Sequence, residues 1–209
     1  MKMHAWFVTA LVALCGLGGS GAETPPPSQN LVRNPSFELD ANGDGIPDAW
    51  QPYRLCTPYG AGECTQDGSI SYDGASSGRI TQGHIYAAIT GSTGWLQQGI
   101  VERGGGRTFR VSVYVRAGKP VPSRWDGYVK SIFPTRVRLY LFGHDPLRGG
   151  DYEGAASPII EVGTEWQEIS HTNTFAPPIH SVSVLLAREA QVGGGDVWFD
   201  RVEVVEARP

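Results

Sequence analysis

The sequence predicts an all-β protein, a β-sandwich jelly roll built from two antiparallel sheets. Short runs of alternating apolar and polar residues recur along the chain, and each run is bounded by Gly, Pro or Asp. The 28 Gly and 15 Pro residues are many for a helical protein, and no low-complexity repeat accounts for them. No segment shows a convincing amphipathic helix. Roughly eight to ten short strands separated by turn residues are typical of a sandwich or jelly roll.

The two clearest strands run from Thr108 to Arg116 and from Arg136 to Phe142. Successive side chains of a strand point to opposite faces, so alternation separates a core row from an outward row. The predicted core rows are Phe109, Val111, Val113 and Val115 in the first strand, and Val137, Leu139 and Leu141 in the second.

Two further strands are predicted nearer the C-terminus, from His180 to Ala187 and from Val197 to Val205. The apolar period of the last one shifts near Asp200, which indicates a β-bulge. Weaker patterns predict strands at 69–72, 79–81, 84–89, 95–101, 159–162 and 166–174.

The N-terminus has the pattern of a secretory signal peptide. Lys2 precedes an apolar run from Ala5 to Leu17, and small residues follow up to Ala22. The run is too short to span a bilayer, which takes roughly 20 residues, so membrane insertion is not expected. We expect cleavage after Ala22, a Pro-rich linker at 23–29, one β-sandwich domain at 30–207, and secretion to the periplasm or the cell exterior.

Two of the three cysteines, Cys56 and Cys64, would remain after this cleavage. In a secreted chain such a pair favours a disulfide, which would stiffen a short loop; two free thiols are the alternative.

The formal net charge is −4, and the basic residues form no stripe. A nucleic-acid partner is therefore not expected. The sequence carries no signal of oligomeric state.

The sharpest local motif runs from Asp40 to Asp48. Asp40, Asn42 and Asp44 place side-chain oxygens at alternating positions, and a glycine follows at the turn. This arrangement suits a hard cation such as Ca²⁺. Gln51 occupies the position at which an EF-hand has its bidentate Glu, so an EF-hand is not expected. The alternative is an Asx-rich turn without metal.

Several segments, in this order, resemble the strands of jelly-roll carbohydrate-binding modules, especially those of families 4, 9 and 22. They are Asn30–Glu38 with Ala49-Trp50, Tyr72–Ile80, Phe109–Ala117, Thr164–Ser170 and Val197–Val204. The resemblance implies the same fold, a carbohydrate ligand and neighbouring central strands. It also implies core positions for Phe37, Trp50 and Trp166, and a structural Ca²⁺ held by Glu38 and Asp200.

Sugar binding needs aromatic rings for the C–H faces of the sugar and polar side chains for its hydroxyls. The outward rows of the two central strands supply Arg110, Tyr114, Arg138 and Tyr140, and the insert between these strands supplies Trp125 and Tyr128. The alternatives are a solvated sheet face, and an insert that folds back and buries its Trp.

These features predict a secreted, non-catalytic carbohydrate-binding module that binds a poly- or oligosaccharide through an aromatic and Arg-lined sheet face or cleft. A structural or adhesive sandwich without a sugar site is the alternative. A polysaccharide lyase or glycosidase is less favoured, because no carboxylate pair for such catalysis is readable. Gln82 and His84 are only faintly similar to the Gln/His pair of alginate-lyase sandwiches.

Overall fold

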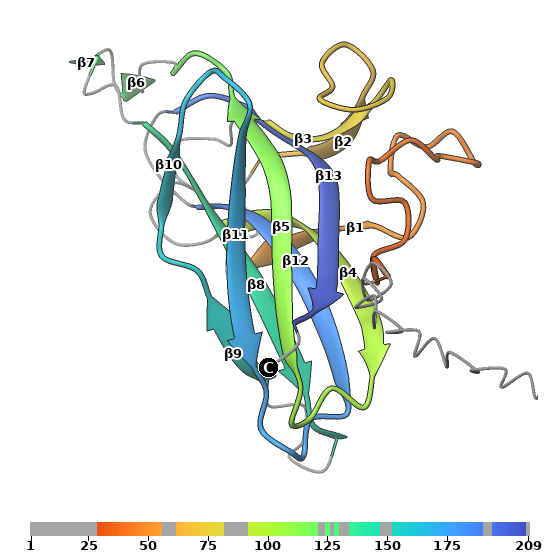
Figure 1. Ribbon diagram of the computed structural model, residues 1–209. Helices are drawn as coiled ribbons and strands as arrows, with labels where there is room; N and C mark the ends of the chain where they lie inside the picture. Colours follow the sequence, from red (N-terminus) through yellow and green to blue (C-terminus); the bar gives the residue numbers. More distant parts are fainter. Residues whose placement is uncertain are drawn as a thin grey trace, which may run out of the picture.

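The computed structural model describes residues 29–55, 62–81, 92–120, 124–125, 128–129, 134–146, 152–189 and 194–207. These residues form thirteen strands and no α-helix. Eleven of the strands form two antiparallel sheets, of six and five strands, packed face to face, and the other two form a hairpin (Figure 1). The predicted all-β sandwich is therefore confirmed. No helix of this part of the chain is long and apolar enough to cross a membrane.

The six-stranded sheet has the order β1-β4-β12-β8-β10, and β9 also pairs with β8. Its strands are β1 (Gln51–Leu55), β4 (Ser92–Glu102), β12 (Ser181–Glu189), β8 (Thr135–His144), β10 (Ile160–Val162) and β9 (Tyr152–Ala156).

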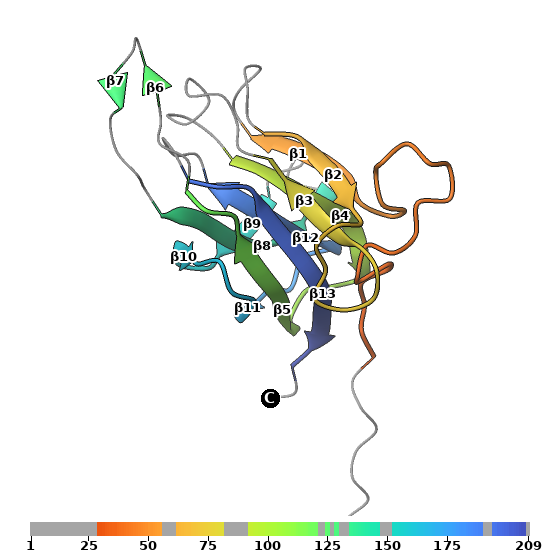
Figure 2. The ribbon, with the colours of Figure 1, turned by 90° about the horizontal axis from the view of Figure 1, so that it is seen from above.

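The five-stranded sheet has the order β11-β5-β13-β3-β2. Its strands are β11 (Gln167–Thr174), β5 (Thr108–Ala117), β13 (Val197–Glu206), β3 (Ser77–Ile80) and β2 (Cys64–Asp67). A separate hairpin of β6 (Arg124–Trp125) and β7 (Tyr128–Val129) projects from one end of the sandwich (Figures 1 and 2).

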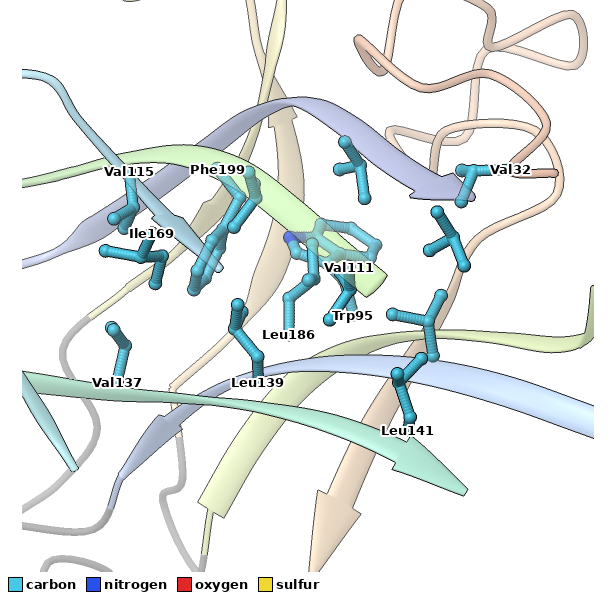
Figure 3. Close-up of a cluster of buried hydrophobic side chains, with 14 of the residues drawn as sticks. Val32, Trp95, Val111, Val115, Val137, Leu139, Leu141, Ile169, Leu186 and Phe199 are labelled. Carbon is cyan, nitrogen blue, oxygen red and sulfur yellow. The ribbon is translucent and has the colours of Figure 1, made fainter. Parts of the chain in front are cut away.

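The core lies between the sheets, where their inward rows meet (Figure 3). Val111 and Val115 come from the five-stranded sheet, and Leu139, Leu186 and Trp95 face them from the six-stranded sheet. All five side chains are fully buried. The alternating patterns of β5 and β8 therefore predicted their core rows correctly.

The segment before β1 closes the sandwich between the edges of the two sheets. Its Leu31 N–H donates to the Val204 carbonyl on β13, at 2.9 Å. On the other side the buried Gln97 amide of β4 both donates to and accepts from the backbone of Arg33, each at 2.9 Å. Phe37 and Trp50 stack at 4.8 Å and are buried, which confirms their predicted core positions.

The bulge predicted near Asp200 is present, because the pairing of β13 with β5 shifts register between Asp200 and Glu203. The strand predicted at 69–72 is wrong. Asp67 Oδ1 accepts hydrogen bonds from the N–H and hydroxyl of Ser69, and this Asx turn leads the chain out of the sheet. The patterns did not predict β1, β2 and β9. The signal peptide, most of the linker, Gln82, His84 and the strand at 84–89 lie outside the described residues.

Candidate functional site

The outward face of the six-stranded sheet carries a second apolar cluster. On β12 the inward row is Val182, Val184 and Leu186, yet the outward row also contains Leu185 and Ala187. Leu96 of β4 pairs with Leu185 and lies beside it. Leu185 is 1% exposed, Ala187 is fully buried, and Leu96 is 6% exposed. We call these three residues the apolar floor.

Aromatic side chains on both sides of the apolar floor cover it from solvent. Tyr53 of β1 packs against it on one side, and Tyr140 and Phe142 of β8 pack on the other. The rings of Tyr140 and Phe142 stack at 5.3 Å with an interplanar angle of 11°. Neighbouring strands lie about 4.8 Å apart, so walls on β1 and β8, three strand spacings apart, stand about 14 Å from each other. The face therefore forms a trough, which we call the cleft.

A pocket of about 60 Å³ opens in the cleft. Tyr53, Leu96, Gln98, Phe142 and Ser183 line it. The hydroxyl of Ser183 accepts a hydrogen bond from the Gly99 N–H at 3.2 Å, and Gln98 is exposed. The pocket thus combines an apolar base with an amide and a hydroxyl at its rim, which are the groups that orient a polyhydroxylated ligand.

Gly94 of β4 leaves the space that the apolar floor needs. A Cβ at this position would lie 2.5 Å from Leu185 Cδ1 and 2.6 Å from the Leu186 carbonyl oxygen. Only glycine therefore lets Leu185 lie across β4 and complete the apolar floor.

A polar cluster lies on the same face, where Glu189 ends β12. Tyr140 donates its hydroxyl proton to Glu189 Oε1 at 3.0 Å, and Arg138 Nε lies 3.4 Å from the same oxygen. Ser92 Oγ lies 3.4 Å from Glu189 Oε2. Burial, followed by the Glu189 carboxylate, raises the pKa of Tyr140, so its hydroxyl stays protonated at neutral pH. The cluster holds a donor, a cation and a carboxylate in fixed positions.

The expectation that the two central strands are neighbours is wrong. β8, with Arg138 and Tyr140, belongs to the six-stranded sheet, whereas β5, with Arg110 and Tyr114, belongs to the five-stranded sheet. Because both pairs point outward, they lie on opposite faces of the molecule and form no single patch. The backbones of Trp125 and Tyr128 pair in the β6–β7 hairpin, and for these two residues the structure describes the backbone alone.

The outward face of the five-stranded sheet carries a row of rings and cations. Arg116 of β5 pairs with Trp198 of β13, which pairs with Arg79 of β3. Arg116 Cζ lies 5.9 Å from the ring centroids of both Trp198 and Trp166, and Arg79 Cζ lies 5.6 Å from that of Trp198. The core position predicted for Trp166 is therefore wrong. It lies one residue before β11, partly exposed, on the outward side.

Glu38 and Asp200 both bind the loop at 72–76. Asp200 Oδ2 accepts the N–H groups of Tyr72 and Asp73, and Glu38 Oε1 accepts those of Ala75 and Ser76, all at 2.7–3.0 Å. A Ca²⁺ site needs six to eight oxygen ligands, whereas these carboxylates face N–H donors. The pair fits loop anchoring better than metal coordination. Calcium here stays a prediction, which melting with and without chelator would test.

The side-chain oxygens of Asp40, Asn42 and Asp44 are bonded within their own loop. Asp40 accepts from Gly43 and Gly45 N–H, Asn42 from Asp44 N–H, and Asp44 from Ile46 N–H. The bonds of Asn42 and Asp44 reach two residues along the chain and are Asx-turn contacts, whereas those of Asp40 reach three and five residues along it. Within the described ranges, no group of three or more His, Cys, Asp and Glu side chains is placed to hold a metal ion.

Cys64 is buried, and its Sγ lies 3.3 Å from the carbonyl oxygen of Gly94. Cys56 lies outside the described residues, so the disulfide stays a prediction.

Comparison with solved structures identifies the architecture. The xylan-binding CBM22-1 domain of Paenibacillus barcinonensis Xyn10C matches with a TM-score of 0.58 and 15% identity, over 87% of this chain and 97% of that domain. A family 16 carbohydrate-binding module matches with a TM-score of 0.54 and 16% identity, over 85% of this chain and all of that one. The chain has the jelly-roll fold of these modules. No protein-family model matches the sequence, and no curated protein matches it.

Proteins of other activities are similar as well. The enzymatically active domain of bacteriophage CBA120 tailspike protein 4 matches with a TM-score of 0.58 and 13% identity, over 85% of this chain. This chain spans only 21% of that domain's length. The Stig cyclase Fisc of Fischerella sp. TAU matches with a TM-score of 0.57 and 15% identity, over 84% of this chain and 96% of the cyclase. At these identities the likeness concerns the fold, and function has to be argued from the site.

Proposed function

We propose that the protein is a non-catalytic carbohydrate-binding module that binds a poly- or oligosaccharide chain in the cleft of its six-stranded sheet. The observation that carries the proposal is the set of partly exposed rings above the apolar floor, Tyr53 on one side and the stacked pair Tyr140 and Phe142 on the other, with the pocket that Tyr53 and Phe142 line. A sugar ring has apolar C–H faces and a polar rim, so it matches an apolar base with aromatic walls and a few polar groups.

The open form of the cleft favours a chain over a single small molecule. A pocket of about 60 Å³ is far smaller than the roughly 300–1,000 Å³ that enclose a drug-sized ligand. The pocket therefore receives one substituent of a ligand whose remaining length lies along the trough. The polar cluster of Arg138, Tyr140 and Glu189 offers hydrogen bonds to hydroxyls at the same wall.

The N-terminal pattern of Lys2, an apolar run and small residues supports secretion with cleavage after Ala22. Secretion would place the module where extracellular polysaccharides occur. N-terminal sequencing of the mature protein in its host tests this part of the proposal.

The binding test is affinity electrophoresis in gels that contain soluble xylan, mixed-linkage β-glucan, galactan or galactomannan. We expect at least one polysaccharide to retard the wild type, and Tyr53→Ala to weaken the retardation about tenfold, because one wall is lost. Tyr53→Phe keeps the ring and should bind nearly as the wild type does. No new reducing ends should form on incubation. Retardation of Tyr53→Ala equal to that of the wild type would place the site outside the cleft.

A further inference from the structure

Tyr72 is an exposed aromatic residue on the opposite side of the molecule from the cleft. Its side chain is 40% exposed. Its ring stacks on that of Tyr114 of β5 at 3.7 Å and 11°, and meets the Trp166 ring edge-on at 5.8 Å and 61°. Hydrogen bonding with the Tyr72 side chain raises the pKa of Tyr114. We call Tyr72, Tyr114 and Trp166 the aromatic platform.

The backbone beneath Tyr72 is held from two distant parts of the chain. Asp200, in the β13 bulge, accepts the N–H groups of Tyr72 and Asp73, and its Oδ1 also accepts the Arg201 N–H. Glu38 holds the far side of the same loop. Gly74, at φ +69°, makes room, since a Cβ there would lie 2.2 Å from Glu38 Oε1.

This anchoring fixes a side chain that contributes little to the core. Tyr72 covers another surface ring, not the interior. The buried Asp200 carboxylate loses hydration in order to hold the loop, which is a cost that folding has to offset. An exposed ring that is already ordered loses little conformational entropy when a ligand stacks on it, so the arrangement favours binding.

Both positively and negatively charged groups surround the aromatic platform. The Arg201 guanidinium lies 5.9 Å from the Tyr114 ring, and Arg116 lies between two indoles with no salt bridge among the described residues. The exposed Glu168 is the cross-strand partner of Tyr114, and the exposed Asp73 follows Tyr72. Together with the Asp200 and Glu38 carboxylates that hold the loop, these groups amount to two cations and four carboxylates, so the surroundings carry no excess of positive charge. They suit the hydroxyls of a neutral sugar better than a phosphate or sulfate group.

We propose that the aromatic platform is a second carbohydrate-binding site, in which a neutral pyranose ring stacks on the Tyr72 ring and contacts the inclined Trp166 ring at its edge. The two sheets are the two layers of the sandwich, so the platform and the cleft face opposite directions (Figure 1). One molecule would then hold two polysaccharide chains at once and cross-link them. The platform needs no contribution from the cleft, so either site can exist without the other.

The test combines affinity electrophoresis with light scattering of the polysaccharide that retards the wild type best. A protein with two sites should make the polysaccharide aggregate, and the aggregates should dissolve at high protein excess. We expect Tyr72→Ala to abolish aggregation while retaining retardation. Tyr53→Ala should also abolish aggregation, and it should keep only the weaker retardation that the platform alone provides. The double variant should show neither effect. Tyr72→Phe keeps the ring and is the matched control for folding and stacking.

The outcomes separate the two proposals. If Tyr72→Ala aggregates the polysaccharide as the wild type does, and if adding Tyr72→Ala to Tyr53→Ala changes nothing further, the platform is overturned and the cleft stays. Loss of all retardation in Tyr53→Ala alone also overturns the platform, because nothing would then bind there. Loss of retardation in Tyr72→Ala, with Tyr53→Ala unaffected, supports the platform and overturns the cleft. A wild type that none of the four polysaccharides retards contradicts both.

Discussion

The outward faces of the two sheets differ in composition. The six-stranded sheet carries the apolar floor between β1 and β8, whereas the five-stranded sheet is rich in Trp, Tyr and Arg. Leu185 is as buried as many core residues although it points away from the core. Arg116 and Arg79 instead lie against indole rings and are only partly buried.

The difference shows two ways of building an aromatic surface. In the cleft the aromatic rings pack against the apolar floor, so each depends on the other for its burial. A substitution in the apolar floor should therefore lower the stability of the protein. On the five-stranded sheet, rings and guanidinium groups stack in rows above a core that is already closed. The partly exposed side chains of that face should therefore be removable at little cost in stability, unlike the buried Trp198.

The largest expected effect is on the floor. Leu185→Ala should lower the free energy of unfolding by about 2–4 kcal/mol, because it empties a site that has almost no access to water. Urea denaturation followed by tryptophan fluorescence measures it. Leu39→Ala, at a side chain that is 61% exposed, is the control and should stay within about 0.5 kcal/mol of the wild type. Equal midpoints for the two variants would mean that the floor is not a second core.

The sequence predicted strands better than it predicted their partners. Alternation fixes which residues of a strand face the same way, so the inward rows of β5 and β8 and the bulge at Asp200 followed from local pattern. Membership of a sheet depends on pairing between segments far apart in the chain. This is why Tyr114 and Tyr140 were expected on one patch, although they lie on opposite faces.

The cleft was only partly predictable for the same reason. Tyr140 was identified, but β1 contains Pro52 and lacks alternation, so Tyr53 gave no strand signal. One usable signal was the apolar outward row of β12, with Leu185 and Ala187. A strand that is apolar on both faces is covered on both. The position of Trp166 depended on where β11 begins, which is among the least reliable features of a pattern.

A smaller effect concerns the acid dependence of the five-stranded face. Burial opposes ionisation of Asp67, but hydrogen bonds from Ser69 and Trp198, and the charge of Arg79, hold its pKa below the ordinary 3.8. A lowered carboxyl pKa contributes stability above the unfolded value, and that stability is lost as the pH falls through the folded value. Asp67→Asn should therefore be less stable at pH 7 by about 1 kcal/mol, and the difference should shrink below about pH 4.

Asp200 lies in the same sheet, but its pKa shifts in the opposite direction to that of Asp67. Burial raises its pKa, against the N–H donors of Asp73, Tyr72 and Arg201. Its contribution to stability is full below the unfolded value, where the carboxyl is protonated, and is lost as the pH rises through the folded value, which is the opposite sign. Thermal melts of wild type and Asp67→Asn at several pH values between 3 and 7 measure the difference between the two proteins. A difference that grows on acidification would contradict the assignment for Asp67.

The smallest effect is expected at Arg110, at the other end of β5 from Arg116. Arg110 Nη2 lies 3.2 Å from Glu203 Oε2, but the two side chains are 46% and 43% exposed, so water and salt screen the pair. Arg110→Ala should change stability by no more than about 0.5 kcal/mol in urea denaturation, and less at high salt. Arg110 and Tyr114 are four positions apart, about 13 Å along a strand, so retardation and aggregation of the polysaccharide should stay as in the wild type. If Arg110→Ala weakens either one severalfold, the binding surface extends along β5 beyond the aromatic platform, and the five-stranded sheet would bind more of the ligand than the single ring proposed for Tyr72.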